Sequence, residues 1–519
     1  MKRILLVALA LLQGLTMCLG QNIPVLHNES VESSSTYIDG NNYQKDLLLY
    51  VDMLQATHPY YADAKHCAQL DKQARKLYKE CGGIDNDIDF KVCLAKLAAS
   101  LGDGHTSVPF WMTFNKVFPV RFALNDNSAI VDVSPEDNRE ILGKKVTRIN
   151  GKSIKHILQI ARPLVSADND AHFENTVKEY LMFADFWPLL GMSNEILLLD
   201  FADGSSTEIA AIDKQNLKIA QLQQNNSGRV TSKRNTLFDY TIYDEESICY
   251  LQFNQFADRI THPQYQQLAR FDEFTRDMFA EIKAKGIKTL VVDLQYNSGG
   301  NSQLGDVLLS WLYPHQDTKQ YGVEVRVSEL LCTFYLYYRK FTVGGKPLKI
   351  GQIYDYMGFD HSKDYQTNYS ALQDPTKHIF NYDREQIFGG NVVFIQSKDS
   401  FSSATLLLTL VRDNGVGIII GTPSGGKPCH YGDILYCTLP NTGTIATVSH
   451  KHFVRPNREL VADKYLVPDV VIDLNNPDKD LVWEWIINNY GANRNAQTRQ
   501  KSDDDSYLWD TIYRSSMDK

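Results

Sequence analysis

Apolar positions in the first part of the chain recur three and four residues apart, the spacing that places them on one face of a helix. This pattern predicts a helix from residue 47 up to the His58-Pro59 pair, where the proline ends it. Residues 68–78 and 90–101 repeat the pattern. The third helix runs into a turn-rich Gly-Asp-Gly-His-Thr segment at 102–106, so we expect a small helical region that presents one histidine.

From residue 116 the pattern changes to short alternating runs bounded by turn residues, which is typical of a small β-rich module. The runs predict strands at residues 117–124, 129–133 and 145–149. Asn150-Gly151 follows the third run and is a strong turn signal. The stretch 144–154 resembles the late part of a PDZ domain, but no glycine-rich carboxylate-binding loop precedes it. Either a structural role or capture of peptide termini fits this module.

The second half of the chain alternates strand and helix patterns. Apolar runs predict strands at 248–253, 289–294, 392–396 and 417–420, and helical spacing predicts helices at 265–284, 304–312 and 404–413. Strands this apolar, separated by helices, indicate an α/β fold with a mostly parallel β-sheet and helices on both faces. Residues 211–235 are polar enough for a linker or an exposed excursion. The tyrosine-rich segment 321–388 indicates an insertion near the strand ends.

The composition of the 519 residues is that of a folded globular protein, with 43% hydrophobic and 22% charged residues. This excludes collagen-like and wholly disordered chains. The 53 Lys and Arg against 62 Asp and Glu leave a formal net charge of -9. Because non-specific nucleic-acid binding depends on basic surfaces, we expect no nucleic-acid partner. The length allows about two to four domains at roughly 150 residues each.

The first residues have the form of a secretory signal peptide. A positive start at residues 2–3 precedes an apolar run at 4–12, and small residues at 18–20 lead to a cut before Gln21. We therefore expect an exported protein, periplasmic or extracellular. A lipoprotein acylated at Cys18 is the alternative. No later stretch approaches the roughly 20 uncharged residues of a membrane-spanning helix, so we expect no stable span after signal removal.

The cysteines are scattered and have no CxxC or zinc-type spacing. Beyond the predicted cut they are Cys67, Cys81, Cys93, Cys249, Cys332, Cys429 and Cys437. In an oxidising compartment Cys67 can pair with Cys81 or Cys93, and Cys429 with Cys437, although buried unpaired thiols are the simpler expectation for most of them. His450 and His452 alternate on a predicted strand without a third ligand, so we predict no metal site and no cofactor.

These patterns divide the chain into a series of expected parts. They are a signal peptide at 1–20, an N-terminal helical region at 21–115, a PDZ-like module at 116–210, an α/β core at 236–480, and a C-terminal helix with a polar tail at 481–519.

Two junctions in the α/β core place loop atoms at the start of a helix. The strand at 289–294 ends in Gln-Tyr-Asn-Ser-Gly-Gly at 295–300, and the strand at 392–396 leads to Ser-Phe-Ser-Ser-Ala at 400–404. Main-chain N–H groups at a helix start are unpaired and suit a developing oxyanion, while a serine there can expose its hydroxyl. Each loop taken alone is explained as simply by helix capping and turns.

A third turn adds a proton acceptor to this set. Gly-Thr-Pro-Ser-Gly-Gly-Lys at 421–427 follows the strand at 417–420 and carries a single lysine. A serine hydroxyl is a poor nucleophile until a neighbouring group accepts its proton, and a lysine in a buried setting can do so. Together the three turns indicate nucleophilic catalysis.

The same segments, in the same order, resemble peptidase family S41, which includes the C-terminal processing (tail-specific) proteases and the tricorn core. The matching motifs are Val291-Val292-Asp293-Leu294 with Asn297 and Gly299-Gly300, then residues 400–404, then 421–427, then Val467-Pro468-Asp469. The resemblance covers residues 236–475, and the helical region with its 102–106 turn resembles the preceding part of bacterial secreted members. It implies a serine-type peptidase with a ClpP/crotonase-like core and a peptide or unfolded-protein substrate.

Carried over residue by residue, the resemblance places the nucleophile on Ser402, with Ser403 as the alternative. The processing-protease branch uses a lysine, which falls on Lys427, and the tricorn branch uses a histidine from an upstream loop, which matches His105. Both candidate bases are present, so His105 and Lys427 stay open at this point. The glutamine that supports the lysine in the processing branch is replaced by Tyr431, which favours His105.

The supporting groups follow from the same resemblance. The oxyanion hole is expected from the main-chain N–H of Gly299 or Gly300 together with that of Ser403. An orienting acid is expected shortly before the Pro-Asp pair, where Asp463 and Glu459 are near but neither falls on the motif. The alternative function is a catalytically inactive S41-fold protein that binds peptides or other ligands. Retention of a serine, a histidine and a lysine in these loops favours the enzyme.

Overall fold

The computed structural model describes residues 40–125, 128–218, 222–224, 229–261, 267, 269–314, 317–360, 380–381, 383–474, 476 and 479–492. The predicted signal peptide and the polar tail lie outside these residues. The chain divides into two compact units. Unit 1 comprises Met1–Asn225, Gln320–Ala371 and Gly425–Lys464, and unit 2 comprises Asn226–Lys319, Leu372–Ser424 and Tyr465–Lys519.

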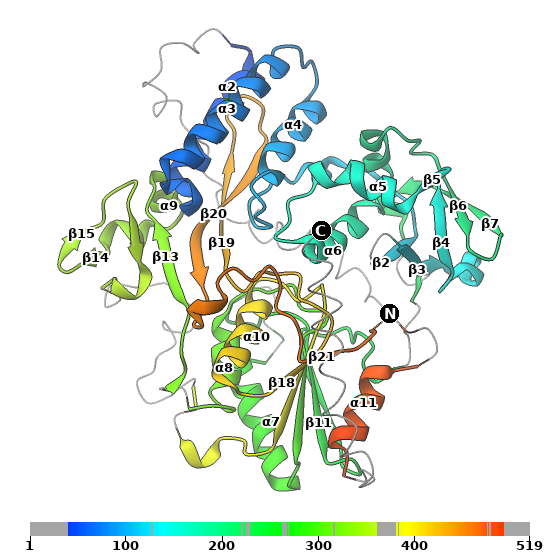
Figure 1. The fold of residues 1–519 in the computed structure, drawn as a ribbon, viewed down its shortest axis with the longest axis vertical. Helices are drawn as coiled ribbons and strands as arrows, with labels where there is room; N and C mark the ends of the chain where they lie inside the picture. Colours follow the sequence, from blue (N-terminus) through cyan, green and yellow to red (C-terminus); the bar gives the residue numbers. More distant parts are fainter. Residues whose placement is uncertain are drawn as a thin grey trace. The chain divides into compact units, whose positions relative to one another are not determined.

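The N-terminal part of unit 1 contains the predicted helices. They are α2 (Asn42–Thr57), α3 (Ala64–Cys81) and α4 (Asp87–Ala99), drawn in blue in Figure 1. Each helix follows a capping residue whose side chain accepts a main-chain N–H of the first turn. The capping residues are Asn41, Asp63 and Asn86 respectively. The end of α2 at Thr57 agrees with the prediction that Pro59 terminates it.

The β-rich module of unit 1 is a mixed group of strands and two helices. Its elements are β1 (Lys116–Val117), β2 (Arg121–Asn125), β3 (Ser128–Pro135), β4 (Lys145–Ile149), β5 (Lys152–Ser153), α5 (Ile154–Ala161), α6 (Asp170–Tyr180), β6 (Ile196–Phe201), β7 (Ser206–Ala210), β8 (Ile212–Asp213) and β9 (Leu222–Gln224). The main sheet runs β2-β3-β4-β6-β7. Asn150 and Gly151 have φ of 48° and 73°, and these positive angles are those a tight hairpin turn requires.

Two short strands lie within the polar segment 211–235, for which the sequence predicts a linker or an exposed excursion. β8 pairs with β1, and β9 pairs with β3, both antiparallel. Such short strands are stabilised by distant partners, which a local polar pattern does not reveal.

A second, antiparallel sheet in unit 1 runs β16-β13-β20-β19. Its strands are β13 (Gly322–Arg326), β16 (Ile353–Asp355), β19 (His430–Thr438) and β20 (Ile445–Val454), and β14 (Thr342–Val343), β15 (Lys346–Pro347) and α9 (Glu329–Phe334) lie between β13 and β16 in the chain. The first part of the predicted insertion at 321–388 is therefore built into a sheet, because β13 pairs with β20 more than a hundred residues later. Both sheets and helices α2–α4 contribute to one apolar core.

Unit 2 has the predicted α/β architecture. Its sheet runs β10 (Phe238–Tyr243), β11 (Ile248–Phe253), β12 (Thr289–Asp293), β17 (Asn391–Gln396), β18 (Ile418–Gly421) and β21 (Val470–Val471). All neighbouring pairs are parallel except β10 with β11. The boundaries of β11 are those predicted from the apolar run. The fold class is confirmed, since the strands are buried and follow one another through helices.

Helices cover both faces of this sheet. They are α7 (Phe271–Lys285), α8 (Gln303–Leu309), α10 (Ser403–Asn414) and α11 (Leu481–Tyr490). Figure 1 shows α7, α8 and α10 on one side and α11 on the other, where Val482 and Ile486 pack against the strands. α7 begins later than predicted. Within the described residues no helix is both long and apolar enough to cross a membrane.

Candidate active site

Ser402 lies in unit 2 between β17 and α10, at the turn where the chain passes from strand to helix. Its backbone has φ 52° and ψ -122°, an uncommon conformation for a residue with a side chain. Such strain costs about 1–3 kcal/mol and persists where the surrounding structure imposes it, often at functional sites. The residue is half-buried, so the turn presents Ser402 rather than packing it away.

The Gly299-Gly300 loop after β12 makes this conformation possible. Gly299 has φ 105°, and a Cβ added to it would lie 2.7 Å from the Ser402 Cβ and 3.0 Å from the Ser403 nitrogen. Gly300 has φ 131°, and its added Cβ would lie 2.3 Å from the Phe256 carbonyl oxygen. Any side chain at either position would collide with main chain, so both glycines are required for the two loops to meet.

The main-chain donors at this meeting point are not equivalent. The Gly299 N–H donates to Asn297 Oδ1 at 2.8 Å. Among the described residues, nothing accepts the N–H of Gly300 or that of Ser403, which is the first residue of α10. Of the two glycines considered for an oxyanion hole, the geometry therefore favours Gly300 as the partner of Ser403.

Asn297 holds the three strand-end loops together and is fully buried. Besides accepting from Gly299, its side chain donates to the Phe253 carbonyl at the end of β11 (2.7 Å). Its own carbonyl accepts the Phe401 N–H at 3.0 Å. A second link runs from the Ser403 hydroxyl to the Gly300 carbonyl at 2.7 Å. The loops after β11, β12 and β17 are thus fixed by hydrogen bonds rather than by packing alone.

His105 lies in unit 1, in the turn after α4, and is 6% exposed. Its main-chain N–H donates to Asp103 Oδ1 at 2.9 Å, and its Nδ1 lies 3.7 Å from the same oxygen. The second oxygen of Asp103 lies within hydrogen-bond distance of three side chains, His58 Nε2 (3.1 Å), Thr106 Oγ1 (2.6 Å) and Ser449 Oγ (2.7 Å). Asp103 is therefore a buried anchor beside the ring of His105.

Opposing effects set the pKa of His105. Burial by itself lowers this pKa, because the charged imidazolium is disfavoured away from water. The carboxylate of Asp103 acts in the other direction, followed by the charges of Asp168 and Asp433, and the pKa is raised overall. His430, whose ring stacks on His105 with 5.7 Å between centres, has its pKa lowered to about 3 by burial and by His105. Of these two histidines, His105 is the one suited to receive a proton.

Lys427 is also in unit 1 and is bonded to the turn that carries His105. Its Nζ donates to the Gly102 carbonyl at 3.1 Å, and its main-chain N–H donates to Asp168 at 3.3 Å. Its carbonyl lies 3.0 Å from His430 Nδ1. The amine thus acts as a hydrogen-bond donor that ties the 427 loop to the histidine turn.

Comparison with known proteins assigns a segment of the chain to a family. Residues 247–472 match the family model Peptidase family S41. This segment belongs to peptidase family S41. The protein is accordingly a serine-type peptidase, a hydrolase that acts on peptides or proteins. No curated protein matches the chain.

Solved structures support the fold of this S41 peptidase. The structure of mature CPAF complexed with lactacystin matches with a TM-score of 0.53 at 14% identity, covering 83% of this chain and 93% of that chain. The crystal structure of mature CPAF matches with a TM-score of 0.55 at 14% identity, covering 86% and 95%. The photosystem II D1 C-terminal processing protease matches with a TM-score of 0.41 at 13% identity, covering 84% and 94%. At these identities the two CPAF structures show a shared fold.

The acids predicted to orient the base in this S41 peptidase have other neighbours in unit 1. Asp463 accepts a hydrogen bond from Arg455 at 2.9 Å. Glu459 lies in the short helix Arg458–Leu460 and is exposed. Within unit 1, the carboxylate beside His105 is Asp103, which the sequence reasoning missed. Its signal was its place in the motif, two residues before the histidine, where an Asp commonly accepts a local main-chain N–H.

The buried acids near His105 are of the residue types that bind metal ions, but their oxygens already accept hydrogen bonds. Atoms of Asp103, His105 and Asp168 that can bind metal lie within 4.8 Å of one another. Both oxygens of Asp103 accept the hydrogen bonds given above, and those of Asp168 accept the main-chain N–H groups of Gly104 and Lys427. Oxygens already directed at N–H and O–H donors are poorly placed for a cation, so this donor set fits a hydrogen-bonded centre better than a metal site.

Proposed function

We propose that this S41 peptidase cleaves peptide bonds through an acyl-enzyme on Ser402, with His105 as general base. The observation that carries the proposal is the geometry around Ser402. The serine is held in a strained turn by Gly299, next to two main-chain N–H groups that the described residues leave without an acceptor. The backbone strain at Ser402 and the N–H groups without an acceptor both lower stability. An oxyanion-binding site explains why they are retained.

The proposed reaction has two steps. The Ser402 Oγ attacks the carbonyl carbon of the substrate while His105 takes its proton, and the tetrahedral intermediate places its negative oxygen on the N–H groups of Gly300 and Ser403. Collapse breaks the C–N bond, and His105 returns the proton to the leaving amine. A water molecule, deprotonated in turn by His105, then hydrolyses the ester and frees Ser402.

Asp103 supports this role for His105 through charge. Once His105 has taken a proton it is an imidazolium, and a neighbouring carboxylate stabilises that state. Asp103 is itself held by four donors, so it cannot turn away when the ring becomes charged. We assign Lys427 a positioning role, because its amine donates to the Gly102 carbonyl of the same turn.

The substrate in this proposal is a peptide or an unfolded protein, since the nucleophile must reach a main-chain carbonyl. We further propose that the protein is exported, on the support of the signal-like pattern at residues 1–20. N-terminal sequencing of the protein secreted by an expressing host checks this: a mature start at Gln21 is expected, and retention of the first residues in a cytoplasmic product would contradict it.

A fluorophosphonate probe tests the nucleophile, because it reacts only with an activated serine. We expect labelling of the wild type and of Ser403→Ala, and complete loss in Ser402→Ala. Casein hydrolysis should follow the same order. Labelling that survives in Ser402→Ala and disappears in Ser403→Ala would move the nucleophile to Ser403. Absence of labelling and hydrolysis in the folded wild type would instead favour the inactive, ligand-binding alternative.

The choice of base is tested by pairs of variants. His105→Ala should abolish turnover, because no other group takes the proton of Ser402. Lys427→Arg keeps a donor for the Gly102 carbonyl but cannot serve as a neutral base, since the guanidinium stays protonated. We therefore expect Lys427→Arg to retain substantial activity. An inactive Lys427→Arg together with an active His105→Ala would identify the lysine as the base.

A further inference from the structure

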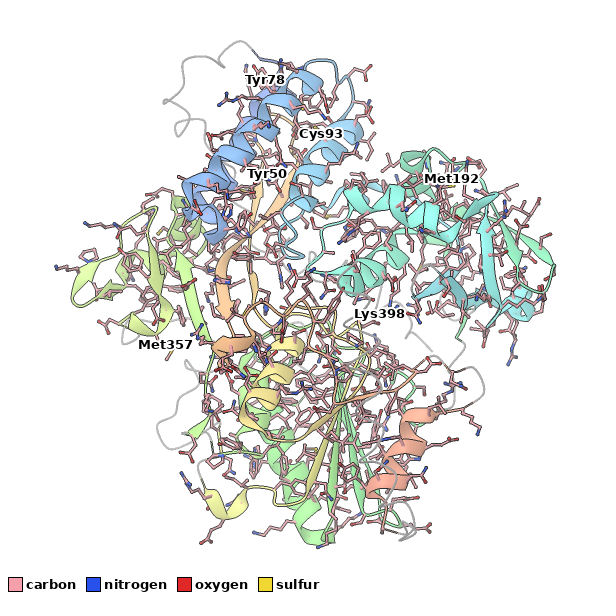
Figure 2. The ribbon with its side chains drawn as sticks, in the orientation of Figure 1. Tyr50, Tyr78, Cys93, Met192, Met357 and Lys398 are labelled. Atoms are coloured by element: carbon pink, nitrogen blue, oxygen red, sulfur yellow. The ribbon has the colours of Figure 1, made fainter. Side chains whose placement is uncertain are left out.

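Two cysteines of unit 1 face each other across a helical hairpin. Cys81 is the last residue of α3 and Cys93 lies in α4, and their Sγ atoms are 3.7 Å apart. Both are buried, with exposures of 0% and 7%. Figure 2 labels Cys93 on α4, beside α3. The short connection at residues 82–86 keeps the two helices adjacent, so the thiols meet through local structure.

Three other cysteines have sulfur contacts with different partners. Cys67 Sγ donates to the Tyr61 carbonyl at 3.0 Å, and Cys437 Sγ donates to Met53 Sδ at 2.9 Å. Cys429 Sγ accepts the Arg455 N–H at 3.3 Å. The pairing of Cys429 with Cys437 considered from the sequence would have to join the residue just before β19 to the second-last residue of that strand, and the extended backbone of the nine-residue strand keeps them apart. Among the described residues, Cys81 and Cys93 are the two cysteines whose sulfurs contact each other.

The contact also prepares one thiol for reaction. The hydrogen bond between the two sulfurs, in which either can be the donor, lowers the pKa of Cys93, although burial acts against it. The thiolate is the nucleophile in thiol–disulfide exchange. The exchange needs one thiolate that attacks and a second thiol that completes it, and we assign these steps to Cys93 and Cys81 in turn.

We propose that Cys81 and Cys93 are a redox pair that closes to a disulfide when a low-molecular-weight disulfide such as oxidised glutathione is present. The Cys93 thiolate attacks one sulfur of the glutathione disulfide, forming a mixed disulfide and releasing one glutathione thiolate. The Cys81 sulfur, after losing its proton, attacks the Cys93 sulfur and releases the second glutathione. Two thiols are oxidised and one glutathione disulfide is reduced to two glutathione molecules.

The geometry requires only a small closure. A disulfide needs about 2.05 Å between sulfurs, so the side chains must approach by less than two ångström from their contact distance. Because both sulfurs are buried, we expect the bond to form most readily while the hairpin folds. The cross-link would brace α4, whose C-terminal end leads directly into the turn that carries His105. The proposal does not depend on catalysis by Ser402.

Tryptic mapping provides a direct test. The protein is refolded from denaturant in oxidised and reduced glutathione, then alkylated under denaturing conditions and digested. Trypsin cuts after Lys79, Lys91 and Lys96, so a bond joins the peptide 80–91 to the peptide 92–96, and the linked mass is two hydrogens below the sum of the free peptides. We expect this linked species as the main product, and its loss in Cys93→Ser.

Stability gives a second, independent readout. Closing a loop of this length should raise the melting temperature by about 5–10 °C relative to the reduced protein. Cys81→Ser and Cys93→Ser should remove the response to reductant, whereas Cys249→Ser, a buried thiol on β11, should keep it. Full alkylation of both cysteines after oxidative refolding, or a linked peptide from another pair, would overturn the proposal, as would an equal melting temperature in both redox states.

Discussion

Replacement of Gly299 by alanine should inactivate the peptidase while leaving it folded. The new Cβ would lie 2.7 Å from the Ser402 Cβ, 3.0 Å from the Ser403 nitrogen and 3.1 Å from the Phe401 carbonyl oxygen. These atoms belong to the rigid turn that starts α10, so the two loops must separate. A shift of about 1 Å at a catalytic group can cost roughly 10²-fold in rate, and we expect kcat/KM to fall at least that far. The φ of 105° adds about 1–3 kcal/mol of backbone strain.

The matched control is Gly415→Ala at the other end of the same helix. Gly415 has φ 66°, but a Cβ there meets nothing within 4 Å. This variant therefore carries the conformational cost of a positive φ, about 1–2 kcal/mol, without the collision. Melting temperature, kcat/KM on a peptide substrate and fluorophosphonate labelling should be measured for both. If Gly299→Ala kept kcat/KM within about threefold of the value for Gly415→Ala, the argument that Gly299 positions Ser402 would be refuted. For comparison, a tenfold change in rate corresponds to about 1.36 kcal/mol of activation free energy.

Three further results are expected. Asn297→Ala should lower kcat by about 10²-fold with little change in KM, because it releases the loop that supplies an oxyanion donor. An unchanged kcat would show that the loops keep their positions without the Asn297 side chain. Asp103→Asn should lower the pKa of His105, so the acid limb of the pH–rate profile should move to lower pH while the maximal rate falls; Asp463→Asn should leave that limb in place. Because the pKa of His105 is raised in the folded protein, its protonation stabilises the fold fully below about pH 6.5, and this stabilisation disappears as the pH rises through the folded pKa. The free energy of unfolding in urea should therefore fall with rising pH in the wild type, and His105→Ala should lack this fall.

The sequence by itself determined the α/β core and the position of the candidate nucleophile. The boundaries of β11 and β4 follow from apolar runs and turn signals, which are local properties of the chain. The same holds for the strand-to-helix junctions at 295–300 and 400–404, because a serine or glycine at a helix start leaves a recognisable pattern.

Tertiary structure decided which of these groups are available and which are occupied. Asn297 takes the N–H of Gly299 and leaves that of Gly300, and no local pattern distinguishes two adjacent glycines. Asp103 is an anchor for His105 only because His58 and Ser449, remote in the chain, donate to it. The segment after residue 321 joins a sheet because β20 supplies its hydrogen bonds. Hydrogen-bond partners far apart in sequence are determined by the fold, since most buried donors and acceptors are satisfied by the groups that packing brings near them.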